Sequence, residues 1–353
     1  MKVAIDAQLA VGTATGIGEY VRGLVRSLSA RGVDVVELDE PRLDPWRFDR
    51  RVFWDQVLLP QRARSSHADL LHCASGTMPL TAAMPVVVTV HDVAWLRVQS
   101  HTKPYARYYF GKFSIDRYRT AAAIAVDSAF SRAELLDVIP GIDPRRVSVV
   151  YPGVAHDFCT LERKPGDGTT ILVVGTVEKR KNLELVIEAL PQLPGARVVS
   201  VGPFTPYQED CAVKAALLGV RDRVEFRGYI DRGELLQLYA TCGVVAAPSV
   251  YEGFGYAVAQ ALCAGAPVLA ADAASLPEVA GGDARVLSLG DVDAWAHALR
   301  EALGGAYDGA ALAARERSIA RFAWAKSAAD MAAMYDSVVL EGTWNRRESE
   351  ASP

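Results

Sequence analysis

The segment at residues 249–272, SVYEGFGYAVAQALCAGAPVLAAD, carries the side chains with the clearest chemical potential in this sequence. Glu252 stands in a glycine-bearing turn between an apolar run and the start of an expected helix. There the positive end of the helix dipole favours a carboxylate, and the first N–H groups of the helix have no partner inside it. Such a turn can bind a polyhydroxylated ligand through Glu252 and through three backbone N–H groups, those of Gly253, Phe254 and Gly255. A carboxylate that only stabilises its own helix, by about 0.3–1 kcal/mol, fits the pattern equally well.

A second candidate is the basic pair Arg180 and Lys181, in a loop that follows the apolar run at 169–176. Asn182 is placed to begin the next helix. Two adjacent cations beside a helix N-terminus suit a diphosphate, because fixed charges and exposed N–H donors act on the same group. A basic pair in a solvated turn is common, so the spacing alone leaves both interpretations open.

Two loops in the first half of the chain add further candidates. His91 ends the apolar run at 85–92, where a neutral imidazole could hydrogen-bond a sugar hydroxyl or stabilise developing charge. A lone histidine more often has a structural role. Gly16 and Gly18 lie between the apolar run at 2–7 and an amphipathic stretch. Glycines there let backbone N–H groups approach an anion, or simply form a flexible turn; they do not match the G-x-G-x-x-G fingerprint of dinucleotide-binding proteins.

These loops belong to two series of apolar, strand-length runs that alternate with amphipathic stretches. Such alternation predicts parallel sheets covered by helices on both faces. Ligands bind at the carboxyl ends of the strands in such sheets, which is where the candidate residues are expected. A polar, aperiodic segment at 155–168 separates the two series. We therefore predict an α/β protein with four parts: a first domain at 1–160, a second at 169–320, a C-terminal helix at 321–342 and a disordered tail at 343–353.

Length and composition restrict the function. The 353 residues suffice for two domains, and a formal net charge of −4 gives no general attraction to nucleic acid. No apolar run approaches the ~18 residues that span a bilayer, and the N-terminus lacks the pattern of a signal peptide. The five cysteines are scattered without a C-x-x-C pair, and no D-x-D-type carboxylate pair presents itself as a metal site. We expect a cytoplasmic protein with no essential metal and no tightly bound cofactor.

Taken together, the motifs strongly resemble those of the retaining GT-B glycosyltransferases of family GT4, also called glycosyl transferases group 1. The resemblance extends over about residues 1–340 and rests on the order of these segments: GIGEY, VTVHD, DSAFSRAELL, VVYPGV, VVGTVEKRKNL, RVEFRGYI and PSVYEGFGYAVAQALCAGAPVLAAD. It implies two Rossmann-like, doubly wound parallel-sheet domains that face a deep cleft. The acceptor would bind the N-terminal domain and the nucleotide-sugar donor the C-terminal one, and the last helix would cross back to the N-terminal domain.

The resemblance also implies roles for single residues. Arg180 and Lys181 would neutralise the donor diphosphate. Glu252, with the backbone of Gly253–Gly255, would contact the donor sugar. The other implied roles are those of His91 near the donor sugar, Tyr229 near the base and Gln260 near the nucleotide ribose.

Two positions depart from the family pattern. Thr176 stands where an arginine is usual, and Gln260 replaces the second acid of the E-x7-E motif. Glutamine keeps an acceptor oxygen but lacks the charge, which fits either weaker nucleotide binding or a preference for a 2′-deoxyribose ring.

The predicted function is retaining transfer of a hexosyl group from a GDP-mannose-like, UDP- or dTDP-sugar to a hydroxyl group. The acceptor would be a glycan, a lipid-linked compound or a small molecule in polysaccharide or glycoconjugate biosynthesis. The basic, aromatic segment 97–119 could contact the inner face of the membrane or pack on the sheet. A nucleotide-sugar-binding paralogue without transfer activity is the alternative, supported by Thr176 and Gln260. A nicotinamide oxidoreductase is disfavoured because the dinucleotide fingerprint is missing.

Overall fold

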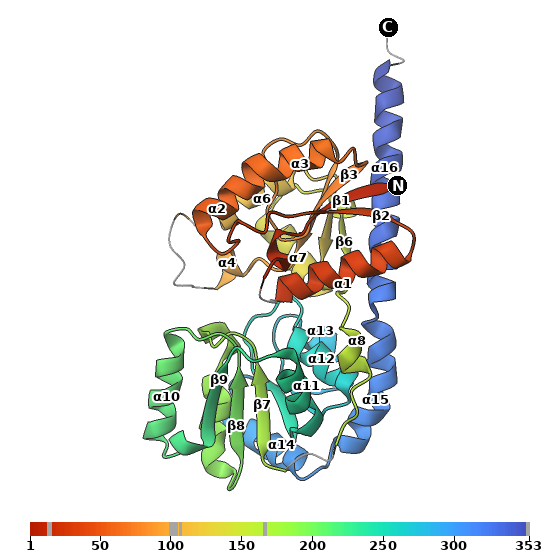
Figure 1. Cartoon of the computed structure of the whole chain (residues 1–353). Helices are drawn as coiled ribbons and strands as arrows, with labels where there is room; N and C mark the ends of the chain where they lie inside the picture. The colour runs from red at the N-terminus through yellow and green to blue at the C-terminus, as the bar shows by residue number, and fades with distance from the viewer. Residues whose placement is uncertain (13–15, 99–104, 106–107, 165–167, 351–353) are drawn as a thin grey trace. The chain divides into compact units, whose positions relative to one another are not determined.

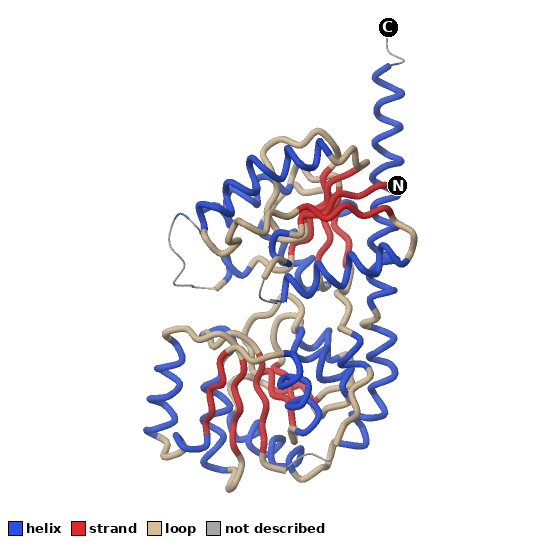
Figure 2. The backbone as a smooth tube through the Cα atoms, in the orientation of Figure 1, coloured by secondary structure: helices blue, strands red, loops and turns tan. Residues whose placement is uncertain are grey.

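The computed structural model describes residues 1–12, 16–98, 105, 108–164 and 168–350. The chain forms two compact units, of which the first contains Met1–Gly153 and Ala323–Pro353 and the second contains Val154–Phe322. In each unit the strands form a layer with helices on both sides (Figure 2).

The described residues of the first unit include a six-stranded parallel sheet in the order β2-β1-β3-β4-β5-β6. Every residue of β3, β4 and β5 is buried, as expected for strands covered on both faces. The strands are β1 (Lys2–Asp6), β2 (Asp34–Leu38), β3 (Leu70–Cys73), β4 (Val86–Val90), β5 (Ala123–Val126) and β6 (Val147–Val149). The helices are α1 (Gly16–Ala30), α2 (Phe48–Phe53), α3 (Leu59–Ser65), α4 (Ala94–Arg97), α6 (Ser114–Tyr118), α7 (Ala129–Val138) and α16 (Trp324–Glu350).

The C-terminal helix α16 is part of the first unit and lies beside α1 (Figure 1). Met331 and Tyr335 of α16 pack in one core with Tyr20 of α1 and the strand residue Ile5. The ring of Trp324 lies so close to the chain that a Cβ on Gly23 would approach it to 2.1 Å and one on Gly153 to 2.3 Å. Only glycine therefore fits at position 23 of α1 and at position 153, because both positions face the ring of Trp324.

The described residues of the second unit include a six-stranded parallel sheet in the order β12-β11-β10-β7-β8-β9. Counted from β7, this is the 3-2-1-4-5-6 order of the Rossmann fold, with its switch point between β7 and β10. The strands are β7 (Thr170–Val174), β8 (Arg197–Val201), β9 (Val224–Gly228), β10 (Val244–Ala247), β11 (Val268–Ala271) and β12 (Arg285–Leu287). The helices are α8 (His156–Cys159), α9 (Leu183–Ala189), α10 (Tyr207–Leu217), α11 (Arg232–Thr241), α12 (Tyr256–Ala264), α13 (Leu276–Ala280), α14 (Val292–Leu303) and α15 (Asp308–Arg321).

The predicted α/β architecture with two doubly wound parallel sheets is confirmed. The boundaries differ in detail from those predicted. The first unit ends at Gly153, and α8 belongs to the second unit although it lies within the segment expected to be an aperiodic linker. Helix α16 continues to Glu350, past the expected helix end at residue 342, and its last turns are rich in the helix formers glutamate and arginine. Residues 165–167 and 351–353 lie outside the described part of the chain.

Candidate active site

The switch point of the second sheet brings together the strongest sequence candidates. Arg180 and Lys181 follow β7, and Glu252 follows β10. These two strands are neighbours although the residues lie more than 70 positions apart in the chain. Because both strands are parallel, the loops after them meet at the same edge of the sheet, where open α/β proteins bind their ligands.

Glu252 forms ion pairs with both cations. Its Oε1 atom lies 2.5 Å from Lys181 Nζ and its Oε2 atom lies 3.0 Å from Arg180 Nη1. Arg180 also pairs through Nε with Glu178 Oε1 at 2.7 Å. Glu252 is only 9% exposed, so these charges interact where water screens them weakly.

Backbone contacts fix the two loops that carry this cluster. The N–H of Val250 donates to the carbonyl of Arg180 at 2.8 Å, and Arg180 Nη1 donates to the carbonyl of Tyr251 at 3.1 Å. Ser275 Oγ lies 2.9 Å from the carbonyl oxygens of both Glu252 and Phe254. The backbone on either side of Glu252 is thus held from two directions, and its carboxylate is positioned before any ligand binds.

Glycines allow this close approach. Gly175, after β7, has a φ of +138°, and a Cβ there would lie 3.1 Å from Lys181 Cε. Gly255 caps α12 with a φ of +96°, and its Cβ would lie 2.8 Å from Leu276. A side chain at Gly175 would push Lys181 away from Glu252, and one at Gly255 would strain the turn that presents the carboxylate.

The surroundings of Glu252 decide its charge. Burial would raise the pKa of its carboxyl group, but Lys181 and Arg180 outweigh burial and hold that pKa below its usual value. Glu252 is therefore a carboxylate at neutral pH. Because Arg180 also pairs with Glu178, the two cations face two carboxylates, and a diphosphate would compete with these for Lys181 and Arg180.

The structure places Gln260 on α12, where its Oε1 accepts a hydrogen bond from the Tyr239 hydroxyl at 3.2 Å. Tyr239 is fully buried, and its ring packs edge-on against Phe158 of α8 with centroids 5.1 Å apart. The acceptor oxygen expected to be available to a ligand thus has a partner inside the unit. Tyr239 was not among the residues singled out by sequence, because a tyrosine within an expected helix has the pattern of a core residue.

The remaining candidates of the second unit have different surroundings. Tyr229 follows β9 and is 57% exposed. The side chain of Phe254 is buried and its ring contacts those of Tyr256 and Phe322. Phe254 therefore acts as a core anchor for the turn, and ligand contact through the backbone of Gly253, Phe254 and Gly255 stays a prediction.

In the first unit, His91 follows β4 and is held by two acceptors. Its Nδ1 lies 2.7 Å from Asp127 Oδ2 and its Nε2 lies 3.1 Å from the carbonyl oxygen of Ala74. This differs from the neutral, available imidazole expected from the sequence. Asp127 was missed, although its place directly after the apolar run of β5 was the same signal that identified His91.

Gly16 and Gly18 lie in the first turn of α1. Gly18 is buried, and a Cβ on Gly16 would meet nothing within 4 Å. Residues 13–15 of the same loop are outside the described part of the chain, so anion contact by this loop stays a prediction.

Another buried charge cluster missed by sequence lies at the switch point of the first sheet. Arg51 is 3% exposed, and its guanidinium reaches Asp6 Oδ2 at 3.2 Å and Asp55 Oδ2 at 3.1 Å. Trp54 Nε1 donates to the other oxygen of Asp6 at 2.9 Å, and the Tyr109 hydroxyl donates to Asp55 at 2.9 Å. These contacts tie β1 to α2 and to the residues that follow it, while Arg51 Nη1 and Asp55 Oδ1 have no hydrogen-bond partner among the described residues.

Two family models match the chain in successive stretches. The model described as Glycosyltransferase Family 4 matches residues 14–158, and the model described as Glycosyl transferases group 1 matches residues 161–317. The chain belongs to the GT4 glycosyltransferases. The resemblance found in the motifs and the prediction of an enzyme that transfers sugars are thereby confirmed.

Similar proteins agree with this assignment. The D-inositol 3-phosphate glycosyltransferase of Mycobacterium avium is 29% identical over 399 residues, covering 97% of this chain and 93% of the relative. That of Mycobacteroides abscessus is 32% identical over 225 residues, which cover 59% of this chain and 50%, about half, of the relative. The crystal structure of Anabaena Alr3699/HepE in complex with UDP-glucose superposes with a TM-score of 0.73 at 19% identity, covering 96% of this chain and all of that one. At this identity the likeness shows that the fold is shared.

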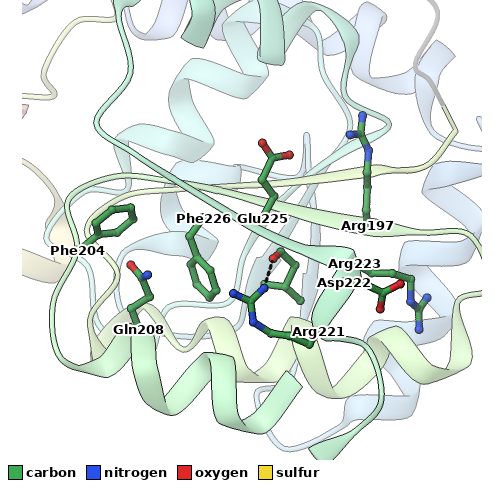
Figure 3. Close-up of a pocket in the computed structure, with 9 residues that line it drawn as sticks. Arg197, Phe204, Gln208, Arg221, Asp222, Arg223, Glu225 and Phe226 are labelled. Carbon is green, nitrogen blue, oxygen red and sulfur yellow. Dashed lines mark hydrogen bonds between the residues drawn. The ribbon is translucent and has the colours of Figure 1, made fainter. Parts of the chain in front are cut away.

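The glycosyltransferase also has a pocket of about 670 Å³ at the sheet edge formed by β9 (Figure 3). In Figure 3 the aromatic rings of Phe204 and Phe226 line one part of it, and Arg221 donates to the carbonyl of Val224 at 3.0 Å. The guanidinium of Arg221 lies 5.7 Å from the Phe226 ring centroid. No predicted site residue lines this pocket, so it is separate from the cluster around Glu252.

The part of segment 97–119 that the structure describes is mixed in character. Tyr108 is 60% exposed whereas Tyr109 and Tyr118 are buried. Arg97 pairs with Glu134 and Asp137, which reduces its attraction to an anionic surface. Residues 99–104 and 106–107 lie outside the description. Membrane contact therefore stays a prediction.

Over the described ranges no helix is long and apolar enough to cross a membrane. Within the same ranges no group of three or more histidine, cysteine, aspartate or glutamate residues is arranged to hold a metal ion.

Proposed function

We propose that this GT4 member is a retaining hexosyltransferase that uses a nucleotide-diphosphate sugar. The observation that carries the proposal is the convergence of Arg180, Lys181 and Glu252 at the switch point of the second sheet. Two cations can stabilise the departing nucleoside diphosphate, and a carboxylate beside them can bind the hydroxyls of the donor sugar.

The charges suggest how transfer proceeds. Cleavage of the donor develops negative charge on the diphosphate and positive, oxocarbenium-like charge on the sugar. Arg180 and Lys181 would stabilise the first charge and Glu252 the second. We propose front-face attack, in which an oxygen of the donor phosphate helps to remove the proton of the acceptor hydroxyl. No protein general base is then required.

The acceptor is proposed as a class: a hydroxyl of a glycan, of a lipid-linked compound or of a small molecule in polysaccharide or glycoconjugate biosynthesis. Relatives named D-inositol 3-phosphate glycosyltransferase and O-antigen chain mannosyltransferase B support both a small-molecule and a glycan acceptor. The reaction is proposed to occur in the cytoplasm, with a nucleotide sugar of that compartment as the donor.

A thermal-shift screen against UDP, GDP, dTDP, ADP and NAD, followed by transfer and donor-hydrolysis assays, tests the proposal. We expect a nucleoside diphosphate to stabilise the protein and the matching sugar nucleotide to be turned over. Stabilisation by NAD alone would contradict it. Stabilisation by a diphosphate without turnover across many acceptors would support the inactive paralogue instead, which the departures from the family motif at Thr176 and Gln260 favour.

Gln260 and Tyr239 make a testable prediction about the nucleotide ribose. Because Tyr239 hydrogen-bonds Gln260 Oε1, the amide would offer mainly its N–H groups to the ribose, and the 2′-hydroxyl should contribute little. Gln260→Glu provides a charged acceptor, so we expect its preference for UDP over 2′-deoxy-UDP to exceed that of the wild type by about threefold or more, since a hydrogen bond to a charged group contributes roughly 1.5–3 kcal/mol.

Isothermal titration with the two nucleotides measures this preference. Tyr239→Phe is the matched control for the tyrosine: it releases Oε1 without changing charge, and we expect a smaller shift in the same direction. Equal preferences in all three proteins would show that residue 260 does not contact the ribose.

A further inference from the structure

The carboxyl ends of three adjoining strands in the first unit meet at one histidine. Ala74 follows β3, His91 follows β4 and Asp127 follows β5, and these strands are successive neighbours in the sheet. His91 lies in the middle, so its ring is between a carbonyl oxygen on one side and a carboxylate on the other.

The partners of the two ring nitrogens define the protonation of His91. A backbone carbonyl can only accept, so the 3.1 Å contact with Ala74 requires a hydrogen on Nε2. Burial raises the pKa of the Asp127 carboxyl, and His91 opposes that rise. As long as Asp127 is ionised it only accepts, so the 2.7 Å contact with its Oδ2 requires a hydrogen on Nδ1. Only the imidazolium carries both hydrogens. A 180° rotation of the imidazole ring would place carbon atoms against Asp127 Oδ2 and the Ala74 carbonyl oxygen. The two contacts therefore also fix the orientation of the ring.

The ion pair between His91 and Asp127 is largely buried. The side chain of Asp127 is 4% exposed and that of His91 is 19% exposed. Among the residues that the structure describes, Asp127 Oδ1 has no hydrogen-bond partner. Since leaving a buried acceptor unpaired costs about 1–3 kcal/mol, the carboxylate is retained here at a cost, and His91 is its only polar partner in the described structure.

The other groups that face His91 do not supply a competing charge. The ring of Tyr20 meets it edge-on at 4.9 Å. Burial lowers the pKa of His72 to about 3, so that neighbour is neutral, and the adjacent carboxylate Asp92 adds to the effect of Asp127. Burial would lower the pKa of His91, but Asp127, the Ala74 carbonyl and Asp92 outweigh it and raise that pKa.

We propose that Asp127 is a positioning residue that, with the Ala74 carbonyl, holds His91 as a fixed imidazolium cation at the carboxyl end of β4. His91 is then not a proton acceptor and cannot be the base that deprotonates the acceptor hydroxyl. It provides a positive charge at the carboxyl edge of the first sheet, which can stabilise negative charge that develops during transfer. The consequence for transfer rests on the proposed function, whereas the charge state of the ring does not.

Nuclear magnetic resonance of the full chain labelled with ¹⁵N-histidine tests the charge state directly. The sequence has six histidines, and His91→Gln identifies the His91 signals by their loss. In the wild type we expect both ring nitrogens to report the imidazolium at pH 7 and to lose it above the usual histidine pKa of about 6.5. A ring that is neutral at pH 7, including one that shares its proton with a protonated Asp127, would overturn the proposal.

Two variants locate the cause. Asp127→Asn keeps the shape and removes the charge, so the His91 titration should move down by about one pH unit or more. Tyr20→Phe is the matched control, because it keeps the ring that meets His91 and removes only a neutral hydroxyl that hydrogen-bonds Thr89; it should change the titration much less than Asp127→Asn does. An unchanged titration in Asp127→Asn would contradict the assignment, and the wild-type measurement decides the charge state even if that variant fails to fold.

The pH dependence of kcat/KM tests the catalytic consequence. The cationic form is the active one, so the rate should fall as pH rises through the raised pKa of His91. In Asp127→Asn this fall should begin about one pH unit lower or more, whereas a merely structural loss would reduce the rate equally at every pH. If no donor is turned over, the proposed function fails while the magnetic resonance result still stands; if transfer is normal but His91 is neutral, only the present inference fails.

Discussion

Replacing Glu252 by glutamine should lower sugar transfer by about tenfold or more while tightening the binding of the nucleoside diphosphate alone. Glu252 now pairs with Lys181 Nζ and Arg180 Nη1, the two groups proposed to bind the diphosphate. Removing its charge releases Lys181 from this ion pair and leaves Arg180 with one carboxylate fewer, so both cations can interact more strongly with the phosphates. It also removes the anion proposed to stabilise the sugar, and tenfold corresponds to about 1.4 kcal/mol of transition-state stabilisation.

Titration calorimetry with the diphosphate identified in the screen and steady-state transfer rates measure the two effects. Charge-assisted hydrogen bonds contribute roughly 1.5–3 kcal/mol, so we expect the dissociation constant to fall by about threefold or more. Glu178→Gln is the matched control, since Glu178 pairs with the same Arg180 but its side chain is 36% exposed. Its effects on both quantities should be small. Normal transfer in Glu252→Gln would refute the assignment of Glu252 to the donor sugar.

Glu252→Ala separates charge from shape. It should lower transfer at least as much as Glu252→Gln, and the fold should survive because Ser275 still holds the turn through the backbone carbonyls of residue 252 and Phe254. Circular dichroism and thermal unfolding check that the loss of transfer is not a loss of structure.

Replacing Lys181 by alanine should weaken both transfer and diphosphate binding, with transfer reduced by about tenfold or more. The variant leaves Glu252 with Arg180 as its remaining cation in the described structure, and the pKa of Glu252 should rise because its principal opposing charge is gone. Lys179→Ala is the matched control: Lys179 belongs to the same helical turn, Lys179–Lys181, but is exposed. It should change neither quantity by more than about twofold.

The same variant has a defined effect on stability. The lowered pKa of Glu252 stabilises the fold above the unfolded-state pKa of about 4.3, and this stabilisation is lost as pH falls through the lower folded-state pKa. Lys181→Ala should therefore melt below the wild type at pH 7, and the difference should shrink as the pH falls below about 4. Scanning calorimetry across this range checks the sign. A difference that is constant with pH would show that Lys181 acts through packing rather than through Glu252.

Together the variants distinguish an active enzyme from a binding paralogue. In an active transferase, Glu252→Gln separates the two functions because binding of the diphosphate rises as transfer falls. In a paralogue without transfer activity only the change in binding would be seen. The cluster at β7 and β10 provides the physical basis for both outcomes.

The sequence by itself determined the elements and the type of site. Apolar runs of strand length and the 3.6-residue period of the intervening stretches depend on local patterning, which predicted two parallel sheets with helices on both faces. A carboxylate in a glycine turn before a helix is also a local feature, so the position of Glu252 at the start of α12 was predictable.

Only the tertiary structure decided which side chains meet. Glu252 lies 71 positions from Lys181, and their contact depends on β10 pairing with β7, a crossover that no local pattern records. Strand order also brings Asp127 and the Ala74 carbonyl to His91, which we propose is an imidazolium cation and not the neutral ligand expected from the sequence. In the second unit, tertiary packing places the Tyr239 hydroxyl within hydrogen-bond distance of Gln260 Oε1. Residue types are set along the chain, but protonation and hydrogen-bond partners follow from strand order, because that order determines which loops lie together at the carboxyl edge of each sheet.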